Sequence, residues 1–382
     1  MQSVNNFIFL RHFFYGFIGS NLNLLLFITF FASLMEGFGF FLLLPLIEVL
    51  DLTEDEIRHG NLSVHFISSI FIYMNLTKEQ LSFFLLFGIA SAFSLKGLIN
   101  YLCFSFIYRL RAQLLYQIKS QLVSRLITID SEDFDKNRQG YFVNIIGEQS
   151  TKCVQSFHNF NLVGVSLLSG FIYLSIVIWL ALPFGLMSLA AAIFVFLIFL
   201  KLNSRVQKLS LDTSKETEFL SDWSILWTNA MGYIKGTGSF RNIYPVVNQA
   251  VQKISQLERK RGQAAALTLS LKEPLVVLLV LATVTIQISL FEASVAEIMV
   301  VLALFYRSLS NFLAAQVAWQ TVMDTFGGVK YTATELSEVN TAEVDRLLNQ
   351  SEVLEVKDID LKEVCWKPNS AEELILKNIN FS

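Results

Sequence analysis

Long apolar runs alternate with charged stretches along this chain. Each run holds close to the roughly 20 helical residues that are needed to cross the hydrocarbon core of a bilayer. An α-helix satisfies its own backbone hydrogen bonds in lipid, whereas a β-barrel would need strands of alternating polarity, which these continuously apolar runs do not provide. The pattern therefore predicts an all-α membrane protein with six transmembrane helices. The six runs occupy residues 22–47, 81–108, 160–182, 184–202, 274–291 and 295–319.

The polar connections between the runs differ in length and in charge. Residues 109–159 and 203–273 are long and rich in Lys and Arg, whereas residues 48–80 begin with an acidic cluster. Basic connections stay on the cytoplasmic side, so the two long connections and both termini are predicted to be cytoplasmic. Apolar residues at three- and four-residue steps between Leu110 and Leu126 predict that the helices continue beyond the bilayer on that side.

The sequence changes character near residue 350. Residues 350–382 contain two short stretches of alternating apolar residues around a polar segment, a pattern typical of a strand, a turn and a second strand. We therefore predict two parts. A transmembrane domain covers residues 1–349, and a β-containing soluble domain starts within residues 350–382.

Composition supports membrane insertion and argues against several kinds of site. The chain is 53% hydrophobic and only 16% charged, whereas a soluble domain carries about a quarter charged residues. The net charge of -3 gives no reason to expect nucleic acid as a partner. The three cysteines and four histidines are scattered, with none at metal-ligand spacing, so neither a metal site nor a disulfide framework is expected.

Three charged residues, Glu36, Lys96 and Arg307, lie well inside the predicted spans. A charge in mid-membrane costs at least about 2.5–3.5 kcal/mol, so these side chains are expected to line a substrate cavity. The structural alternatives are an ion pair between helices or a lysine that reaches the interface. At about 1.5 Å per residue, Lys96 and Arg307 fall at similar depth and Glu36 roughly 10 Å nearer the outer face, so no tight triad is expected. Two cations at one level would need water between them, which favours a hydrated cavity and an anionic cargo group such as phosphate.

Four segments, taken in order, resemble the transmembrane subunits of ABC (ATP-binding cassette) exporters. The family's two cytoplasmic loops are similar to LVSRLITIDSEDFDKNRQGYFVNIIGEQSTKC at 122–153 and to WTNAMGYIKGTGSF at 227–240. The helix before the nucleotide-binding domain resembles TAEVDRLLNQ at 341–350, and the opening of that domain resembles IDLKEVCWKPNSAEELILKNINFS at 359–382. With six spans arranged in three hairpins, the resemblance covers essentially the whole chain.

The resemblance implies an architecture, partners and a mechanism. Two copies of this chain, or this chain and a homologous half-transporter, would pack twelve spans around a cavity in the bacterial inner (cytoplasmic) membrane, in contact with membrane lipid. ATP and Mg²⁺ would bind the nucleotide-binding domain of the full-length protein. Neither is expected on this chain alone, because it contains no G-x-x-x-x-G-K-[ST] sequence. ATP turnover would drive alternating access and export a hydrophobic or amphipathic cargo, such as a lipid, a lipid-linked glycan, a peptide or a drug.

The resemblance also assigns contact residues. Residues 129–135 and 220–227 correspond to the short coupling helices that dock onto nucleotide-binding domains, and clustered aromatic residues at such loop tips favour a contact surface over an ordinary solvated turn. Trp366 stands beside Pro368, which occupies the place of the family's adenine-stacking tyrosine, and Trp366 is therefore the expected adenine contact. The expected coupling residues are Asp130, Phe134, Asp135, Trp223 and Trp227.

Two other classes of function stay open at this point. An ion-coupled secondary transporter would need broken helices and paired acidic residues at mid-membrane. A non-transporting membrane scaffold or receptor would not need long helical extensions that end in aromatic tips. Only the exporter hypothesis accounts for both loops and for the strand-forming tail, and it is the function that we expect.

Overall fold

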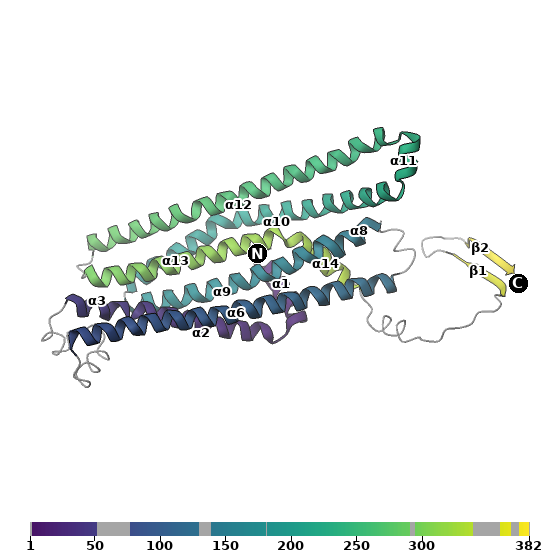
Figure 1. Ribbon diagram of the computed structural model, residues 1–382. Helices are drawn as coiled ribbons and strands as arrows, with labels where there is room; N and C mark the ends of the chain where they lie inside the picture. The colour runs from purple at the N-terminus through teal and green to yellow at the C-terminus, as the bar shows by residue number, and fades with distance from the viewer. Residues whose placement is uncertain are drawn as a thin grey trace. The chain divides into compact units, whose positions relative to one another are not determined.

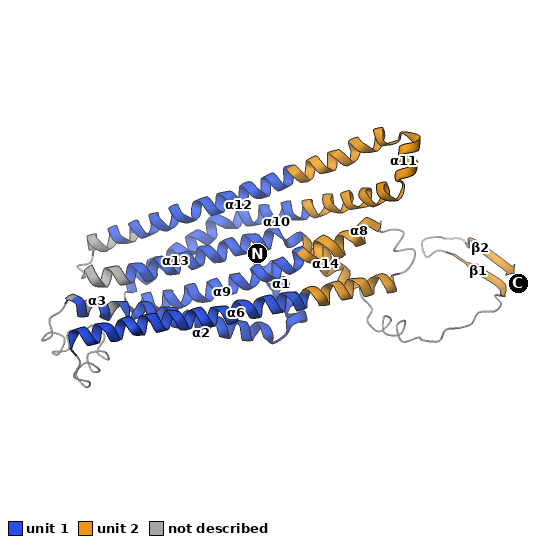
Figure 2. Cartoon of the chain, in the orientation of Figure 1, with its two compact units in different colours: residues 1–114, 152–212, 256–327 blue, residues 115–151, 213–255, 328–382 orange. Residues whose placement is uncertain are grey.

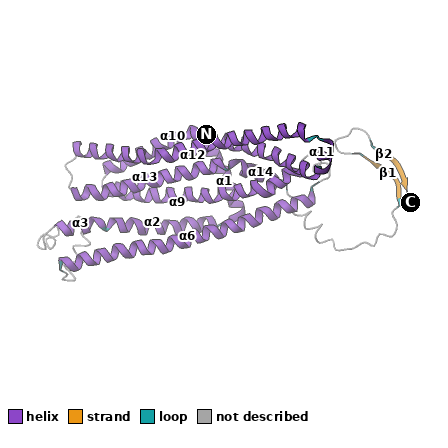
Figure 3. Cartoon of the chain, turned by 45° about the horizontal axis from the view of Figure 1, so that its top comes forward, coloured by secondary structure: helices purple, strands orange, loops and turns teal. Residues whose placement is uncertain are grey.

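The structure, a computed structural model, divides into two compact units, each built from three separate stretches of chain (Figures 1 and 2). Unit 1 holds residues 1–114, 152–212 and 256–327, and unit 2 holds residues 115–151, 213–255 and 328–382. Outside a C-terminal hairpin, the described secondary structure is helical (Figure 3). The structure describes residues 2–51, 77–129, 139–180, 182–290, 295–338, 360–367 and 374–381.

The helices follow one another with short breaks. Pro183 lies in the first turn of α10, where a missing amide hydrogen costs no backbone hydrogen bond. By contrast, α12 continues through Pro274, where the fifth span was predicted to begin. The helices are α1 (Gln2–Ile18), α2 (Asn21–Phe41), α3 (Leu43–Asp51), α6 (Lys78–Thr128), α8 (Gln139–Asn144), the π-helix η1 (Ile145–Gln149), α9 (Ser150–Leu180), α10 (Leu182–Asn229), α11 (Met231–Thr237), α12 (Phe240–Leu290), α13 (Val295–Asp324) and α14 (Phe326–Ser337).

Six of the described helical segments are long and apolar enough to cross a membrane, which confirms the predicted number of spans and indicates an integral membrane protein. α6 and α12 have 51 residues each and α10 has 48, more than twice the roughly 20 that one crossing needs. The predicted helical extension of these spans is therefore present as continuous helix. The six segments are Asn21–Ile47, Lys78–Thr128, Gln139–Leu180, Leu182–Asn229, Phe240–Ala282 and Val301–Asp324.

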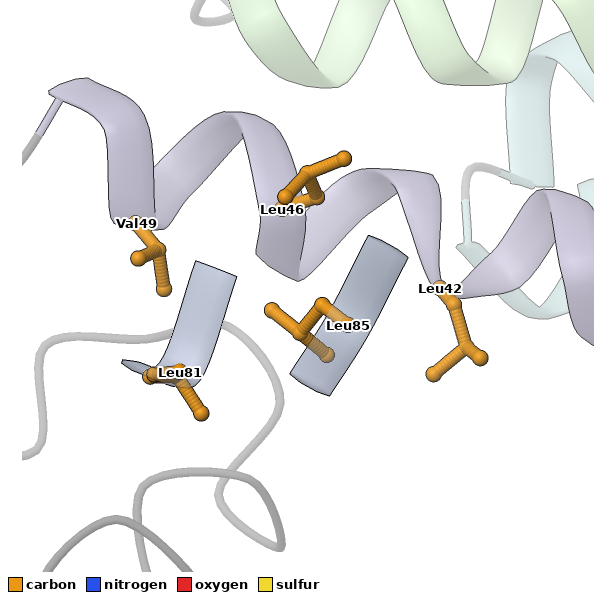
Figure 4. Packing of buried hydrophobic residues seen from close by; sticks show 5 residues of the cluster. All are labelled: Leu42, Leu46, Val49, Leu81 and Leu85. Carbon is orange, nitrogen blue, oxygen red and sulfur yellow. The ribbon is translucent and has the colours of Figure 1, made fainter. Parts of the chain in front are cut away.

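In unit 1, α2 and α3 pack against the first half of α6 in one antiparallel register. At one end, Leu42, Leu46 and Val49 are buried against Leu81 and Leu85, as Figure 4 shows. The register continues along both helices, because Gly39 faces the ring of Phe93 and Thr29 lies 3.4 Å from Cys103. A side chain at Gly39 would collide with Phe93, so the small residue is what allows the two helices to approach this closely.

The N-terminal helix α1 was not among the predicted elements. Its residues Leu10 and Phe14 are fully buried in unit 1, and the ring of Phe14 packs edge-on against Phe157 of α9 at 5.3 Å between centroids. Asn6 donates a hydrogen bond to Gln207 of α10 at 3.0 Å. The segment has 17 residues and is interrupted by Arg11 and His12, so it is shorter than the roughly 20 apolar residues by which a membrane span is detected in a sequence.

In unit 2, α8 and α14 are held together by polar contacts. Tyr141 of α8 donates a hydrogen bond to Glu335 of α14, and Arg125 of α6 pairs with Glu338 at 2.9 Å. The backbone of Gly140 packs directly on the backbone of Asp222 in α10, and any side chain at position 140 would clash there. The close approach of α8 to α10 therefore requires glycine.

The two strands predicted in the tail are present as an antiparallel hairpin of β1 (Leu361–Trp366) and β2 (Leu376–Phe381). The ladder shifts register twice, and in each shift one strand has one residue more than its partner. Glu363 and Asn378, which lie within these shifts, have positive φ values of 52° and 49°. Both lie where the ladder is irregular, and such interruptions are positions where a non-glycine residue is tolerated in the left-handed region.

Candidate functional site

The three membrane charges meet at one point in unit 1. The Glu36 carboxylate of α2 accepts Lys96 Nζ of α6 at 2.6 Å on Oε2, and it accepts Arg307 of α13 at 2.7 Å on Oε1. The expectation that no tight triad forms is therefore wrong. Their pairing reduces the cost of placing three charges within membrane-spanning helices.

The predicted depths are wrong because residues were counted from opposite ends of spans whose boundaries are not fixed by the sequence. The helix that carries Glu36 does not stop near residue 47. It continues as α3 to Asp51, and Val49 packs at the level of Leu81. Counted from that packed pair, Glu36 and Lys96 lie at nearly equal distances along their helices. At about 1.5 Å per residue, an error of a few residues at each end is enough to separate groups that are in contact.

Burial is unequal among the three side chains. Glu36 is 8% exposed and Lys96 19%, whereas Arg307 is 42% exposed. One carboxylate thus neutralises one of two cations, and the cluster carries a net charge of +1. A charge left over in a low-dielectric region is costly unless water or a counter-ion reaches it. The exposed guanidinium is the part of the cluster that such a group can reach.

The charges open into a polar cavity of about 170 Å³. One water needs roughly 10–15 Å³ of such space, so the cavity has room for on the order of ten waters or for a small polar group. In its wall, Ser33 of α2 and Ser169 of α9 are hydrogen-bonded at 2.6 Å. Asn311 donates its side-chain amide to the carbonyl of Arg307 at 2.9 Å. Four helices, α2, α6, α9 and α13, therefore contribute polar side chains to one cavity.

Two aromatic residues complete the surroundings of the ion cluster. Tyr173 of α9 is fully buried, and its hydroxyl lies against the Glu36 carboxylate outside ordinary hydrogen-bond geometry. The guanidinium of Arg307 lies over the ring of Phe40, 5.8 Å from its centroid, within range of a cation–π attraction. Tyr173 and Phe40 also pack edge-to-face on each other.

Sequence reasoning missed Tyr173, Asn311 and the serine pair, although a signal for them exists. Polar residues recur three or four positions apart within otherwise apolar runs, so each set lies on one face of its helix. The sets are Thr29, Ser33 and Glu36 in α2, Lys96 and Asn100 in α6, Ser169 and Tyr173 in α9, and Arg307 and Asn311 in α13.

A second cavity in unit 1, of about 270 Å³, is lined almost entirely by apolar side chains such as Phe7, Phe196 and Trp319. Its polar exception, Gln316, exchanges two side-chain hydrogen bonds with Asn203 of α10 at 3.0 and 3.4 Å. This apolar cavity has few polar groups that could select one ligand over another, whereas the charged cavity has both space and such groups.

The predicted coupling residues are placed only in part. Asp130, Phe134 and Asp135 lie outside the described residues. Trp223 and Trp227 lie in the last turns of α10, so the prediction of a separate short helix at 220–227 is wrong. The two tryptophans are also half-buried, in contrast to the exposed tip that was expected; Trp223 packs on Phe219. The short helix of this connection is α11, at Met231–Thr237.

Two further features of unit 2 bear on the predicted sites. Burial, together with the neighbouring Glu218 carboxylate, raises the pKa of Tyr331 to about 12, so this hydroxyl stays protonated and bonds to Glu218.

Trp366 ends β1 opposite Leu376 and is half exposed, while Pro368 lies outside the described residues. The adenine contact of Trp366 stays a prediction.

Among the described residues, no group of three or more His, Cys, Asp or Glu side chains is arranged to hold a metal ion. The candidate site is therefore the ion cluster of Glu36, Lys96 and Arg307 with its cavity. Comparison of the chain with protein-family models and with curated proteins finds no match.

Proposed function

We propose that this chain is the transmembrane subunit of an ATP-driven exporter that moves an amphipathic cargo by alternating access. The observation that carries the proposal is the polar, net-positive cavity between α2, α6, α9 and α13, all of which belong to helical segments able to cross a membrane. A structural bundle has no need for such a cavity, because unpaired charge within the membrane is costly and marks substrate or ion pathways.

Two features favour ATP as the energy source. α6, α10 and α12 are each long enough to continue well past one bilayer crossing, as a subunit that must reach nucleotide-binding domains requires. The hairpin of β1 and β2 follows these helices and supports a soluble domain after them. ATP and Mg²⁺ would bind in that domain, and a second copy of the chain or a homologous half-transporter would supply the other half of the cargo pathway.

The test is transport by the chain joined to its nucleotide-binding domain and reconstituted in lipid vesicles. A fluorescent, short-chain phospholipid with an anionic headgroup serves as the probe. We expect flipping of the probe to require ATP and Mg²⁺ and to persist when proton and sodium ionophores collapse ion gradients. The matched control is a variant in which the phosphate-binding lysine of the nucleotide-binding domain is replaced, so that ATP is not hydrolysed. Flipping that is abolished by ionophores and unaffected by ATP would instead identify an ion-coupled transporter.

A further inference from the structure

The ion cluster contains two cations that share a single carboxylate. Each oxygen of Glu36 holds one of them, Lys96 on one side and Arg307 on the other. Neither cation has the carboxylate to itself. Glu36 therefore bridges the two cations but supplies only one negative charge, so the cluster keeps a net charge of +1.

The two cations are more accessible than the carboxylate. Exposure rises from the nearly buried Glu36 to Lys96 and then to Arg307. A molecule that enters the cavity can therefore reach the ammonium and the guanidinium more readily than the carboxylate. Side-chain amides of Asn100 and Asn311 line the same cavity and add neutral hydrogen-bonding capacity.

We propose that this cavity binds the phosphate group of an amphipathic cargo, and that Glu36 is an internal counter-ion that the phosphate displaces from Lys96 and Arg307. The inference rests on the proposed function, since it names the cargo class for the same cavity. Phosphate fits the site because guanidinium binds phosphate oxygens through two parallel hydrogen bonds, and because an ammonium adds a point charge beside it. A neutral headgroup would gain neither contact.

The counter-ion role gives a prediction of opposite signs. Glu36 competes with the incoming anion, so its replacement by Gln frees both cations and strengthens anion binding. Replacement of Arg307 by Gln removes the bidentate partner and weakens binding. A purely structural triad would lose binding, or fold, in both variants alike.

The experiment is equilibrium binding of radiolabelled decyl phosphate to the full chain in micelles of dodecyl maltoside, a detergent without phosphate, with empty micelles as the baseline. Loss of a charge-assisted hydrogen bond is worth about 1.5–3 kcal/mol, so Arg307→Gln is expected to weaken binding about tenfold or more. Glu36→Gln is expected to tighten it by a few-fold. Arg205→Gln, at an exposed arginine of α10, is the matched control and leaves binding unchanged.

Further arms decide the source of the phosphate and protect the test against misfolding. Decyl phosphate is expected to bind more tightly than inorganic phosphate; equal binding would keep the anion site and assign it to a free ion. If Arg307→Gln fails to accumulate, Arg307→Lys keeps the charge without the fork and should weaken binding by less. The proposal is overturned if decanol binds as well as decyl phosphate, or if Glu36→Gln weakens binding as Arg307→Gln does. Binding needs no ATP, so a failure of ATP-driven transport alongside intact binding would refute the exporter and not the site.

Discussion

At the scale of single residues, Glu36 supplies the negative charge that stabilises the two cations in the interior of unit 1. It is nearly buried, and it is the carboxylate that holds both Lys96 and Arg307. Burying ions costs several kcal/mol each, and only good geometry offsets that cost. The carboxylate meets this condition with one contact on each oxygen. Lys96 is less critical, since Glu36 would keep Arg307 without it.

This asymmetry predicts unequal effects on stability in the absence of anion. Glu36→Gln leaves two neighbouring cations without a carboxylate and is expected to lower the free energy of unfolding by about 3 kcal/mol, whereas Lys96→Gln should cost about 1–2 kcal/mol. The double variant should lose less than the sum of the single variants, with a coupling of at least about 1 kcal/mol. Denaturant unfolding in detergent measures all three, with Arg205→Gln as a surface control. Strictly additive losses would show that the pair contributes no interaction energy.

At the scale of elements, the antiparallel packing of α2 and α3 on α6 places the site. Gly39 opposite Phe93 and Thr29 opposite Cys103 set a register that brings Lys96 opposite Glu36. The register depends on which small residues face which large ones, and on where each helix ends. Both are properties of packed pairs of helices.

The register predicts a disulfide. Thr29 and Cys103 are buried, and Thr29 Oγ1 lies 3.4 Å from Cys103 Sγ. In a chain without Cys153 and Cys365, Thr29→Cys is therefore expected to cross-link to Cys103 on mild oxidation, since the two sulfur atoms need only a small adjustment to reach bonding distance. Loss of thiol labelling in the denatured chain, restored by reductant, measures the yield.

The neighbouring variant Phe30→Cys serves as the control for this cross-link. Phe30 is exposed and lies about 100° further around α2, so its thiol should stay free. Equal cross-linking from both positions, or cross-linking from position 30 alone, would mean that the helix faces are assigned incorrectly.

The difference between local sequence patterns and packing between helices explains what the sequence could predict. Six apolar runs and the strand pair of the tail were predicted correctly, because hydrophobic period and length are local properties of a segment. The end of α2 and α3 and the uninterrupted course of α10 past Trp223 were not predicted, because tertiary packing sets them. The ion cluster was missed for that reason: its members were identified correctly, but their meeting depends on register.

At the scale of the whole molecule, charge distribution and not apolar length decides orientation in the membrane. Basic residues concentrate in the connections 109–159 and 203–273, and such connections stay on the cytoplasmic side. The helices α6, α10 and α12 continue through these basic stretches without interruption. We therefore expect the basic ends of all three helices to lie on the same, cytoplasmic side of the membrane.

Orientation is testable with single cysteines in a chain from which Cys103, Cys153 and Cys365 have been removed. Glu79, in the first turn of α6, and Arg259, in α12, are both exposed and both lie at polar positions, so they form a matched pair. We expect Glu79→Cys to react with a membrane-impermeant maleimide added to intact cells, because it borders the acidic connection 48–80. Arg259→Cys should react only after permeabilisation, because it lies in the basic stretch.

Reaction of Arg259→Cys in intact cells would reverse the orientation and would place the long helical extensions on the side without ATP, which would remove the basis for an ATP-driven exporter. Protection of both positions would mean that one of them lies in lipid or in a protein contact, and an additional probe at Thr77 would then decide the side of the α6 end.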